Sequence, residues 1–206
     1  MKNILLIQSS PRGNDSYSHK AAHSITTELQ ARNPGAKVVV RDLGQNPPPH
    51  VGLAFITAIH AAPEQRTPEQ AKALALSDAL IDELFAADMI ILAVPMHNFA
   101  PPSPFKSWVD YVARAGRTFS YSSQGPEGLL KGKRAIVMLA SGGVYSSGPA
   151  KQFDFTEPYV RTVLTFLGIT DVDVVRVEGT TRSTVGPEKA LAAAATQSEE
   201  ILAKLA

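Results

Sequence analysis

The sequence predicts an α/β fold: a doubly wound, five-stranded parallel sheet with helices on both faces. Two observations carry this prediction. Five short segments are predominantly apolar, and the runs from Ile4 to Ile7 and from Met89 to Val94 are continuous, as expected for parallel strands that are covered on both sides. Segments of helical character alternate with them, and the right-handed crossover rule then favours a doubly wound topology. A length of 206 residues fits one domain, so we expect residues 1–206 to fold as a unit.

The first third of the chain opens with a strand and a helix. Ile4 to Ile7 form the first apolar run, and the helix that follows a polar loop ends near Asn33 to Gly35. Val38 to Val40 predict the second strand. The stretch from Asp42 to Pro68 reads as irregular, but its semi-apolar part, Val51 to Ala62, predicts an excursion helix.

The middle of the chain continues the alternation. Glu69 to Ala87 predict a helix with one broad apolar face, and Met89 to Val94 predict the third buried strand, which Pro95 ends. The next helix begins around Pro104, since proline suits the first helical turn. Thr118 to Pro126 predict an excursion that is rich in turn residues.

The last third supplies two more strands and two more helices. Ala135 to Leu139 predict the fourth strand, and Asp171 to Val177 predict the fifth. Thr156 to Gly168 predict the helix between them. Glu188 to Ala206 predict a terminal helix, because alanine is abundant there and favours helices.

Composition narrows the class of function. With 20 basic and 19 acidic side chains the formal net charge is +1, and no basic cluster predicts binding to nucleic acid or to an anionic membrane. The chain has no cysteine, which excludes disulfides and a cysteine nucleophile. The apolar run at the N-terminus is too short for a signal peptide, and no run has transmembrane length. We expect a cytoplasmic protein that acts on a small molecule.

The loop after the first strand predicts a phosphate site. Ligands of doubly wound folds bind beyond the carboxyl ends of the strands. Ser9 to Ser18 are rich in hydroxyl groups, include Arg12 and run into a helix N-terminus, whose free N–H groups accept anions. The alternative is that Ser16 or Ser18 is only an N-cap. The number of hydroxyl groups favours a ligand, because one cap needs only one.

Two further strand ends predict a site for a flat ring. Pro95 to Pro102 combine apolar surface from Met96 and Phe99 with the polar groups of His97 and Asn98. After the fourth strand, Ser141 to Gly143 allow main-chain N–H groups to approach a ligand without interference from a Cβ. One anionic end and one planar ring describe a mononucleotide.

The missing motifs narrow the choice of nucleotide. No Gly-x-Gly-x-x-Gly follows the first strand, and no Gly-x-x-x-x-Gly-Lys-[Ser/Thr] occurs, which argues against a dinucleotide dehydrogenase and against an NTPase. FMN, with its phosphate and isoalloxazine, fits what remains. His19 and His23 have the spacing of a two-histidine metal site, but no third ligand is evident, so we expect two exposed histidines and no metal.

Several motifs together give the chain a resemblance to a known family. They are Ser9-Ser10 with Ser16-Tyr17-Ser18, then Pro95 to Phe99, then Ala113 to Tyr121, followed by Gly125 to Gly128, Gly132 to Ala135 and Leu167 to Asp171. The sequence resembles the FMN-dependent NADH-azoreductase and NAD(P)H:quinone oxidoreductase family along nearly its whole length.

The resemblance implies a fold, an activity and an assembly. The fold would be flavodoxin-like, with strand order 2-1-3-4-5. The protein would be a homodimer that holds FMN noncovalently and reduces quinones and aromatic azo compounds with NADH or NADPH by two-electron, ping-pong hydride transfer. The implied FMN contacts are Ser10, Ser16, Tyr17, Ser18, Met96, His97, Asn98, Phe99, Ala140, Ser141, Gly142 and Gly143.

The chain departs from the family's usual residues at two places. Members often carry Tyr where this chain has His97, and Ser-Arg-Gly-Gly where this chain has Ala140 to Gly143. His97 and Tyr145 are possible proton or hydrogen-bond donors near the flavin, although each could instead only pack or orient. Two other functions stay open: a noncatalytic flavodoxin-like electron carrier, and an NADPH-dependent reductase that exchanges FMN as its product.

Overall fold

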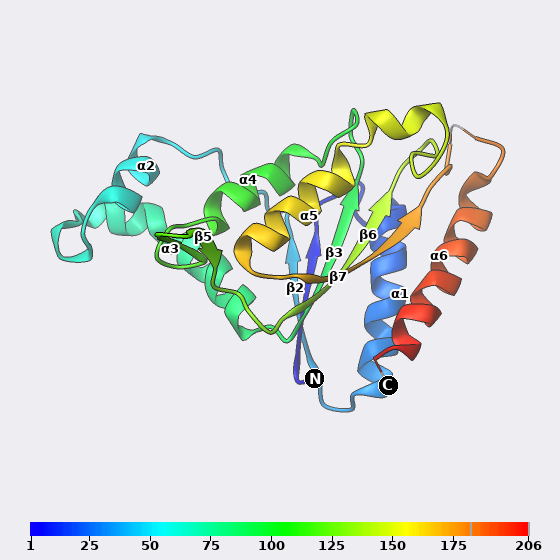
Figure 1. The fold of residues 1–206 in the computed structure, drawn as a ribbon, viewed down its shortest axis with the longest axis horizontal. Helices are drawn as coiled ribbons and strands as arrows, with labels where there is room; N and C mark the ends of the chain where they lie inside the picture. The colour runs from blue at the N-terminus through cyan, green and yellow to red at the C-terminus, as the bar shows by residue number, and fades with distance from the viewer. Residues whose placement is uncertain (182, 206) are drawn as a thin grey trace.

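A five-stranded parallel sheet forms the centre of the computed structural model, which describes residues 1–181 and 183–205 (Figure 1). The order in the sheet is β2-β1-β3-β6-β7. Because β6 and β7 are the fourth and fifth parallel strands, the predicted order 2-1-3-4-5 is confirmed. The parallel strands are β1 (Asn3–Gln8), β2 (Lys37–Asp42), β3 (Met89–Pro95), β6 (Arg134–Ala140) and β7 (Asp171–Val177).

Helices cover both faces of this sheet, as predicted (Figure 1). One face carries α1 (Tyr17–Arg32) and α6 (Gly186–Ala203). The other carries α3 (Pro68–Ala86), α4 (Ser103–Val112) and α5 (Thr156–Leu167). The expected terminal helix extended to Ala206, which lies outside the described residues. No described helix combines the length and the apolar character needed to cross a membrane.

The sheet separates two apolar cores, and alternate residues of β1 supply each of them. Leu5 and Ile7 pack into the core under α3, α4 and α5, whereas Ile4 and Leu6 pack under α1 and α6. Side chains of successive strand residues point to opposite faces, so a strand covered on both faces must be apolar throughout. The continuous apolar runs in the sequence are explained by this double burial.

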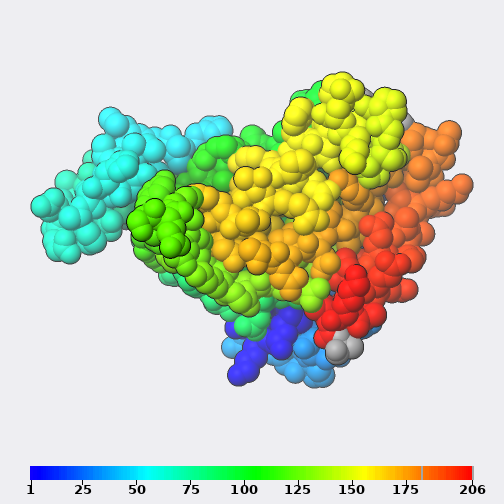
Figure 2. All heavy atoms as spheres, viewed as in Figure 1, coloured from blue at the N-terminus to red at the C-terminus, as the bar shows by residue number. Residues whose placement is uncertain are grey.

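The predicted excursion helix is present as α2 (Leu53–His60), which packs against α3 and projects from the body of the molecule (Figures 1 and 2). Phe55 attaches it to the body, because its ring lies 4.7 Å from that of Tyr111. Leu53 stays 80% exposed on this projection. The helix is followed by a short 3-10 turn, η2 (Pro63–Gln65).

The turn-rich excursion expected at Thr118 to Pro126 contains two short strands that the sequence did not predict. The segment forms an antiparallel hairpin of β4 (Phe119–Ser122) and β5 (Gly125–Gly128). Tertiary contacts hold it: the Phe119 and Phe166 rings lie 4.5 Å apart, and a Cβ on Gly128 would meet the Gly168 backbone at 2.1 Å. Because strands of four residues are too short to show a clear alternation of burial, the sequence carried little strand signal.

The parallel register brings the ends of four strands to one edge of the sheet. Gln8 is aligned with Ala93, and Pro95 with Ala140, which in turn is aligned with Val177. The loops that follow β1, β3, β6 and β7 therefore lie together. Short 3-10 turns occur in two of these loops, at η1 (Gly13–Asp15) and η3 (Pro149–Phe153).

Candidate functional site

The loop between β1 and α1, residues 9–18, is called the serine loop below. Its last serine before the helix, Ser16, is the N-cap of α1 and accepts the backbone N–H of His19 at 3.5 Å. Ser16 therefore does cap the helix. Two N–H groups of the first turn remain free, because those of Tyr17 and Ser18 have no hydrogen-bond partner among the described residues. These two groups are available to an anion.

A cation lies beside this helix terminus. The guanidinium of Arg12 lies over the Tyr17 ring, 5.5 Å from its centroid, and Lys20 lies at the same distance from that ring. Arg12 makes no salt bridge with any described residue, so its positive charge adds to the positive end of the α1 dipole. Both favour an anionic ligand at this end of the site.

The serine loop borders a cavity of about 200 Å³, called the serine cavity. It is lined by Ser10, Arg12, Ser16, Tyr17, Pro95, Met96, His97, Ala140, Ser141, Gly142, Thr180 and Thr181. The predicted contact Ser18 does not line it. Ser18 is fully buried, and its hydroxyl lies 3.0 Å from that of Ser16, which does line the cavity.

The loop after β3 makes a tight turn over residues 97–100. His97 N–H donates to the Ala100 carbonyl at 2.8 Å, and the Ala100 N–H returns a bond to His97. Asn98 and Phe99 both have positive φ, 47° and 75°, as in a type I′ turn. Asparagine tolerates this conformation, but for phenylalanine it is strained by about 1–3 kcal/mol. Such strain at a loop tip is typical of functional sites.

The Phe99 ring is held by neighbours and stays half exposed. It lies 5.6 Å from the Phe153 ring and 6.3 Å from the Tyr145 ring, edge-on to the latter. The Phe99 carbonyl accepts hydrogen bonds from the Phe155 N–H and the Thr156 hydroxyl, which tie the turn to the start of α5. With a 45% exposed side chain, Phe99 offers aromatic surface to a ligand.

A second cavity of about 400 Å³, called the aromatic cavity, opens between this turn and the loop after β6. It is lined by Met96, His97, Asn98, Phe99, Gly142, Gly143 and Tyr145. Because Met96, His97 and Gly142 also line the serine cavity, the two cavities adjoin. Together they make one elongated site with a cationic, hydroxyl-rich end and an aromatic end.

The loop after β6 is braced from within and by the loop after β7. The Ser141 hydroxyl donates to the Gly143 carbonyl at 2.8 Å, and the Gly179 N–H donates to the same oxygen at 3.0 Å. The N–H groups of Gly142 and Gly143 have no hydrogen-bond partner in the described part of the chain. A Cβ on Gly143 would lie 3.2 Å from the Tyr145 ring, so glycine keeps this backbone accessible.

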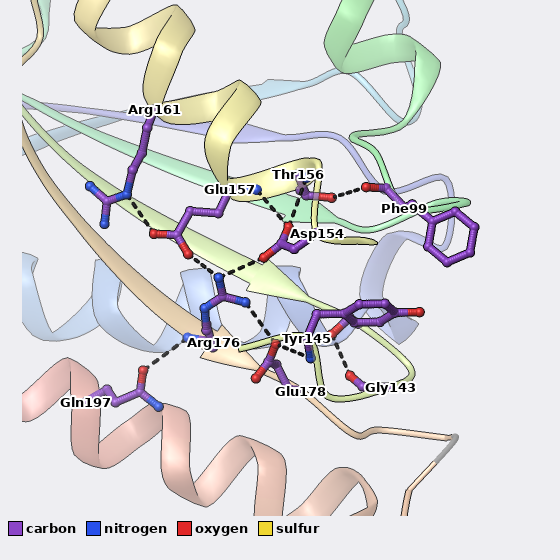
Figure 3. A network of polar contacts seen from close by, with 11 residues as sticks. Phe99, Gly143, Tyr145, Asp154, Thr156, Glu157, Arg161, Arg176, Glu178 and Gln197 are labelled. Carbon is purple, nitrogen blue, oxygen red and sulfur yellow. Dashed lines mark hydrogen bonds and ion pairs between the residues drawn. The ribbon is translucent and has the colours of Figure 1, made fainter. Parts of the chain in front are cut away.

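Figure 3 shows the polar network that supports Tyr145 from below. Arg176, near the end of β7, forms ion pairs with Asp154, Glu157 and Glu178, and Glu178 accepts the Tyr145 N–H at 2.9 Å. Burial alone would lower the pKa of Arg176, but the three carboxylates raise it above its usual value. Arg176 is therefore a permanent cation that fixes the loop carrying Tyr145 to the start of α5.

The structure brings eleven of the twelve predicted contacts to the lining of the two cavities, with Ser18 just behind them. Tyr145, the predicted donor that follows the glycines, lines the aromatic cavity. Thr180 and Thr181 also line the serine cavity, but they were not predicted as site residues from the sequence. They follow β7, and the rule that ligands bind at strand ends would have found them had it been applied to the fifth strand.

One expectation about the histidines is wrong. His23 is exposed, as predicted, but His19 is only 2% exposed, and its Nε2 accepts the Ser10 N–H at 3.2 Å. Burial lowers the pKa of His19, and the negative charge of Asp42 and the nearby Gly13 backbone oppose this shift. Among the described residues no group of three or more histidine, aspartate and glutamate side chains could hold a metal.

Sequence and structure comparisons place the chain among known proteins. A protein-family profile described as a flavodoxin-like fold matches residues 2–202. The FMN-dependent NADH:quinone oxidoreductase of Mesorhizobium japonicum is 48% identical over 98% of this chain and 95% of its own length. The protein of the same name from Herminiimonas arsenicoxydans is 46% identical, over 98% of this chain and 99% of its own length.

Solved structures of azoreductases also superpose closely on this chain. The azoreductase of Bacillus anthracis strain Sterne superposes with a TM-score of 0.85 at 30% identity, covering 97% of this chain and 96% of its own. An FMN-dependent NADH-azoreductase from Bacillus anthracis strain Ames Ancestor, solved with FMN, gives a TM-score of 0.86 at 27% identity over the whole of both chains. The chain therefore belongs to the flavodoxin-like family of FMN-dependent NADH:quinone oxidoreductases and azoreductases.

Proposed function

We propose that this protein is an FMN-dependent NADH:quinone oxidoreductase that also reduces aromatic azo compounds. The observation that carries the proposal is the elongated site, whose two ends differ in chemistry in the way the two ends of FMN do. The names of the relatives support the same activity. The assignment of individual residues to parts of FMN belongs to the same proposal.

The serine cavity suits the phosphate of FMN. Ser10 and Ser16 offer hydroxyl groups, the first turn of α1 offers two free N–H groups, and Arg12 offers a cation. Charge-assisted hydrogen bonds of this kind are about twice as strong as neutral ones. Ser18 would act indirectly, through the hydroxyl of Ser16.

The aromatic cavity suits the isoalloxazine. Met96 and Phe99 would contact its faces, whereas Asn98 and the N–H groups of Gly142 and Gly143 would reach its polar edge. Ala140 and Ser141 line the serine cavity next to Gly142, which both cavities share, and would lie along the ribityl chain. Each group on the ligand thus meets residues of matching chemistry.

When bound, FMN would accept a hydride from NADH and deliver two electrons to a quinone or azo acceptor, in ping-pong order. The protein's residues would orient the flavin and the substrates and stabilise the charge that develops on the ring. Free N–H groups of Gly142 and Gly143 would offset negative charge at the ring edge. His97 and Tyr145, which line the same cavity, would serve as proton or hydrogen-bond donors to the acceptor. No protein nucleophile is required.

We further propose a cytoplasmic homodimer of a single FMN-binding domain, residues 1–206. The projecting helix α2 supports the dimer, because Leu53 and Ile56 are apolar and exposed on it. A partner subunit placed there would bury these side chains and bring α2 toward the neighbouring active site. NADH is the expected donor, as in the names of the relatives, and NADPH is the alternative to be compared with it.

The first test is cofactor uptake and turnover. Purified protein is saturated with FMN, desalted and assayed for benzoquinone-dependent oxidation of NADH and of NADPH. We expect FMN to stay bound in stoichiometric amounts and to support turnover. Loss of the flavin on desalting, with flavin reduction as the sole activity, would identify a reductase that exchanges FMN. Retained flavin without NADH oxidation would identify an electron carrier.

A further inference from the structure

We propose that the neutral imidazole of His19 is a positioning residue for phosphate recognition: by accepting the N–H of Ser10, it holds the serine loop in the shape that receives the phosphate of FMN. The inference rests on the proposed function. It assigns a role to a residue that lies outside both cavities. His19 would contact no atom of the cofactor.

The geometry places the ring across the serine loop. His19 is the third residue of α1, and its buried ring accepts the Ser10 N–H through Nε2 at 3.2 Å. This single contact supports the serine loop from behind, at Ser10.

The contact with Ser10 requires one protonation state of the ring. Nε2 can accept the Ser10 N–H only when it carries no proton, so the proton of the neutral ring lies on Nδ1. An imidazolium has no acceptor and would break this bond. Burial lowers the pKa of His19, as does nearby His23, while Asp42 and the Gly13 backbone oppose the shift. The net direction favours the neutral form that the bond needs.

Ser10 has little freedom to find another partner. The residue is 1% exposed, so its N–H would be left unpaired in the interior without the imidazole. On its other side lies the turn after β2, where a Cβ on Gly44 would meet the Ser10 carbonyl oxygen at 2.1 Å. Ser10 is therefore held between the His19 ring and the Gly44 backbone. Loss of the acceptor is expected to move Ser10 and its hydroxyl out of the serine cavity.

The test compares FMN with riboflavin, which has the same ring but no phosphate. His19→Gln keeps an acceptor oxygen near the position of Nε2, and His19→Met removes the acceptor at similar volume. His23→Met is the matched control, because His23 lies one turn further along α1 and contacts Gln8 instead of the serine loop. Dissociation constants for both flavins are measured by fluorescence quenching at pH 8.

We expect wild type, His19→Gln and His23→Met to bind FMN alike, and His19→Met to bind it about tenfold more weakly, the cost of one unpaired buried N–H. Riboflavin affinity should be the same in all four proteins. Equal losses for FMN and riboflavin, equal losses in His19→Gln and His19→Met, or no loss in His19→Met would each overturn the positioning role.

A measurement on the wild-type protein covers the case in which His19→Met does not fold. Nitrogen-15 NMR of the histidine rings at pH 7 should show His19 as a neutral ring with its proton on Nδ1. An imidazolium or a proton on Nε2 would overturn the inference. Failure of the wild type to bind FMN at all would instead overturn the proposed function, so the two failures are distinguishable.

Discussion

Gly44 lies so close to Ser10 that a Cβ on Gly44 would be 2.1 Å from the Ser10 carbonyl oxygen and 2.6 Å from its carbonyl carbon. Real Cβ atoms do not approach a backbone this closely. The turn after β2 is tightened by Asp42, whose carboxylate accepts the Gly44 N–H at 2.9 Å. Gly44, which is distant from Ser10 in the sequence, therefore fixes the backbone of a residue that lines the serine cavity.

Gly44→Ala should displace Ser10. We expect the free energy of unfolding to fall by about 1–3 kcal/mol, as in other overpacked sites, and FMN affinity to fall more than riboflavin affinity. Urea unfolding and flavin titrations measure the two effects. Gly52→Ala is the control, because a Cβ there meets nothing within 4 Å and the residue's φ is −109°. Equal behaviour of the two variants would contradict the close contact.

Phe99→Asn should separate the conformation of the turn from the role of the ring. Asparagine tolerates the positive φ at this position, so the strain of about 1–3 kcal/mol is partly relieved while the aromatic surface is lost. We expect thermal stability to change little and the affinity for both FMN and riboflavin to fall, because Phe99 would contact a face of the isoalloxazine that both share. Flavin titrations and a thermal melt check this. Unchanged flavin affinity would show that the Phe99 ring does not contact the isoalloxazine.

Arg176→Met should destabilise the protein strongly. The change leaves Asp154, Glu157 and Glu178 without their shared cation. Breaking a fully buried ion pair costs about 3–5 kcal/mol, so this network, whose arginine side chain is 21% exposed, should lose somewhat less. Urea unfolding at pH 7 measures the loss. Arg32→Met, which removes an exposed pair with Glu28 and one hydrogen bond to the Leu202 carbonyl, should cost about 1–2 kcal/mol. A loss at Arg176 no larger than that at Arg32 would contradict the network's structural role.

The lowered pKa of His19 predicts a pH-dependent contribution to stability. The unfolded chain takes up a proton on this histidine near pH 6.5, whereas the folded protein does so only at lower pH. The contribution is therefore fully present above about pH 7 and is lost as pH falls through the folded-state pKa. The difference in free energy of unfolding between wild type and His19→Gln should be constant above about pH 7 and shrink below it. A difference that stays constant from pH 8 to pH 5 would contradict a buried neutral ring.

The sheet and its helices were predictable because the hydropathy pattern of each segment matches its burial in the fold. Val94 and Leu92 lie in a strand whose residues are all buried, and such a strand must be apolar throughout whatever its neighbours are. The cavity residues were predictable for a related reason. Met96 and Gly142 follow parallel strands, and the parallel register brings these strand ends together.

The features that escaped prediction depend on contacts across the fold. The hairpin of β4 and β5 is held by Phe166 and Gly168, which lie far along the chain. The burial of His19 was not predicted. It depends on a contact with Ser10 across a loop, and no periodicity in the sequence describes the shape of that loop. The positive φ of Phe99 contradicts the preference of phenylalanine and is maintained by the Phe155 and Thr156 bonds to its carbonyl.

The most direct test of the central claim is an anaerobic visible spectrum of the FMN-loaded protein, recorded before and after NADH and again after benzoquinone. We expect NADH to bleach the flavin absorbance and benzoquinone to restore it, in two separate steps with one equivalent of each reagent. A protein that takes up no FMN, or whose bound flavin is not bleached by NADH, would contradict the assignment of the elongated site to a flavin reductase.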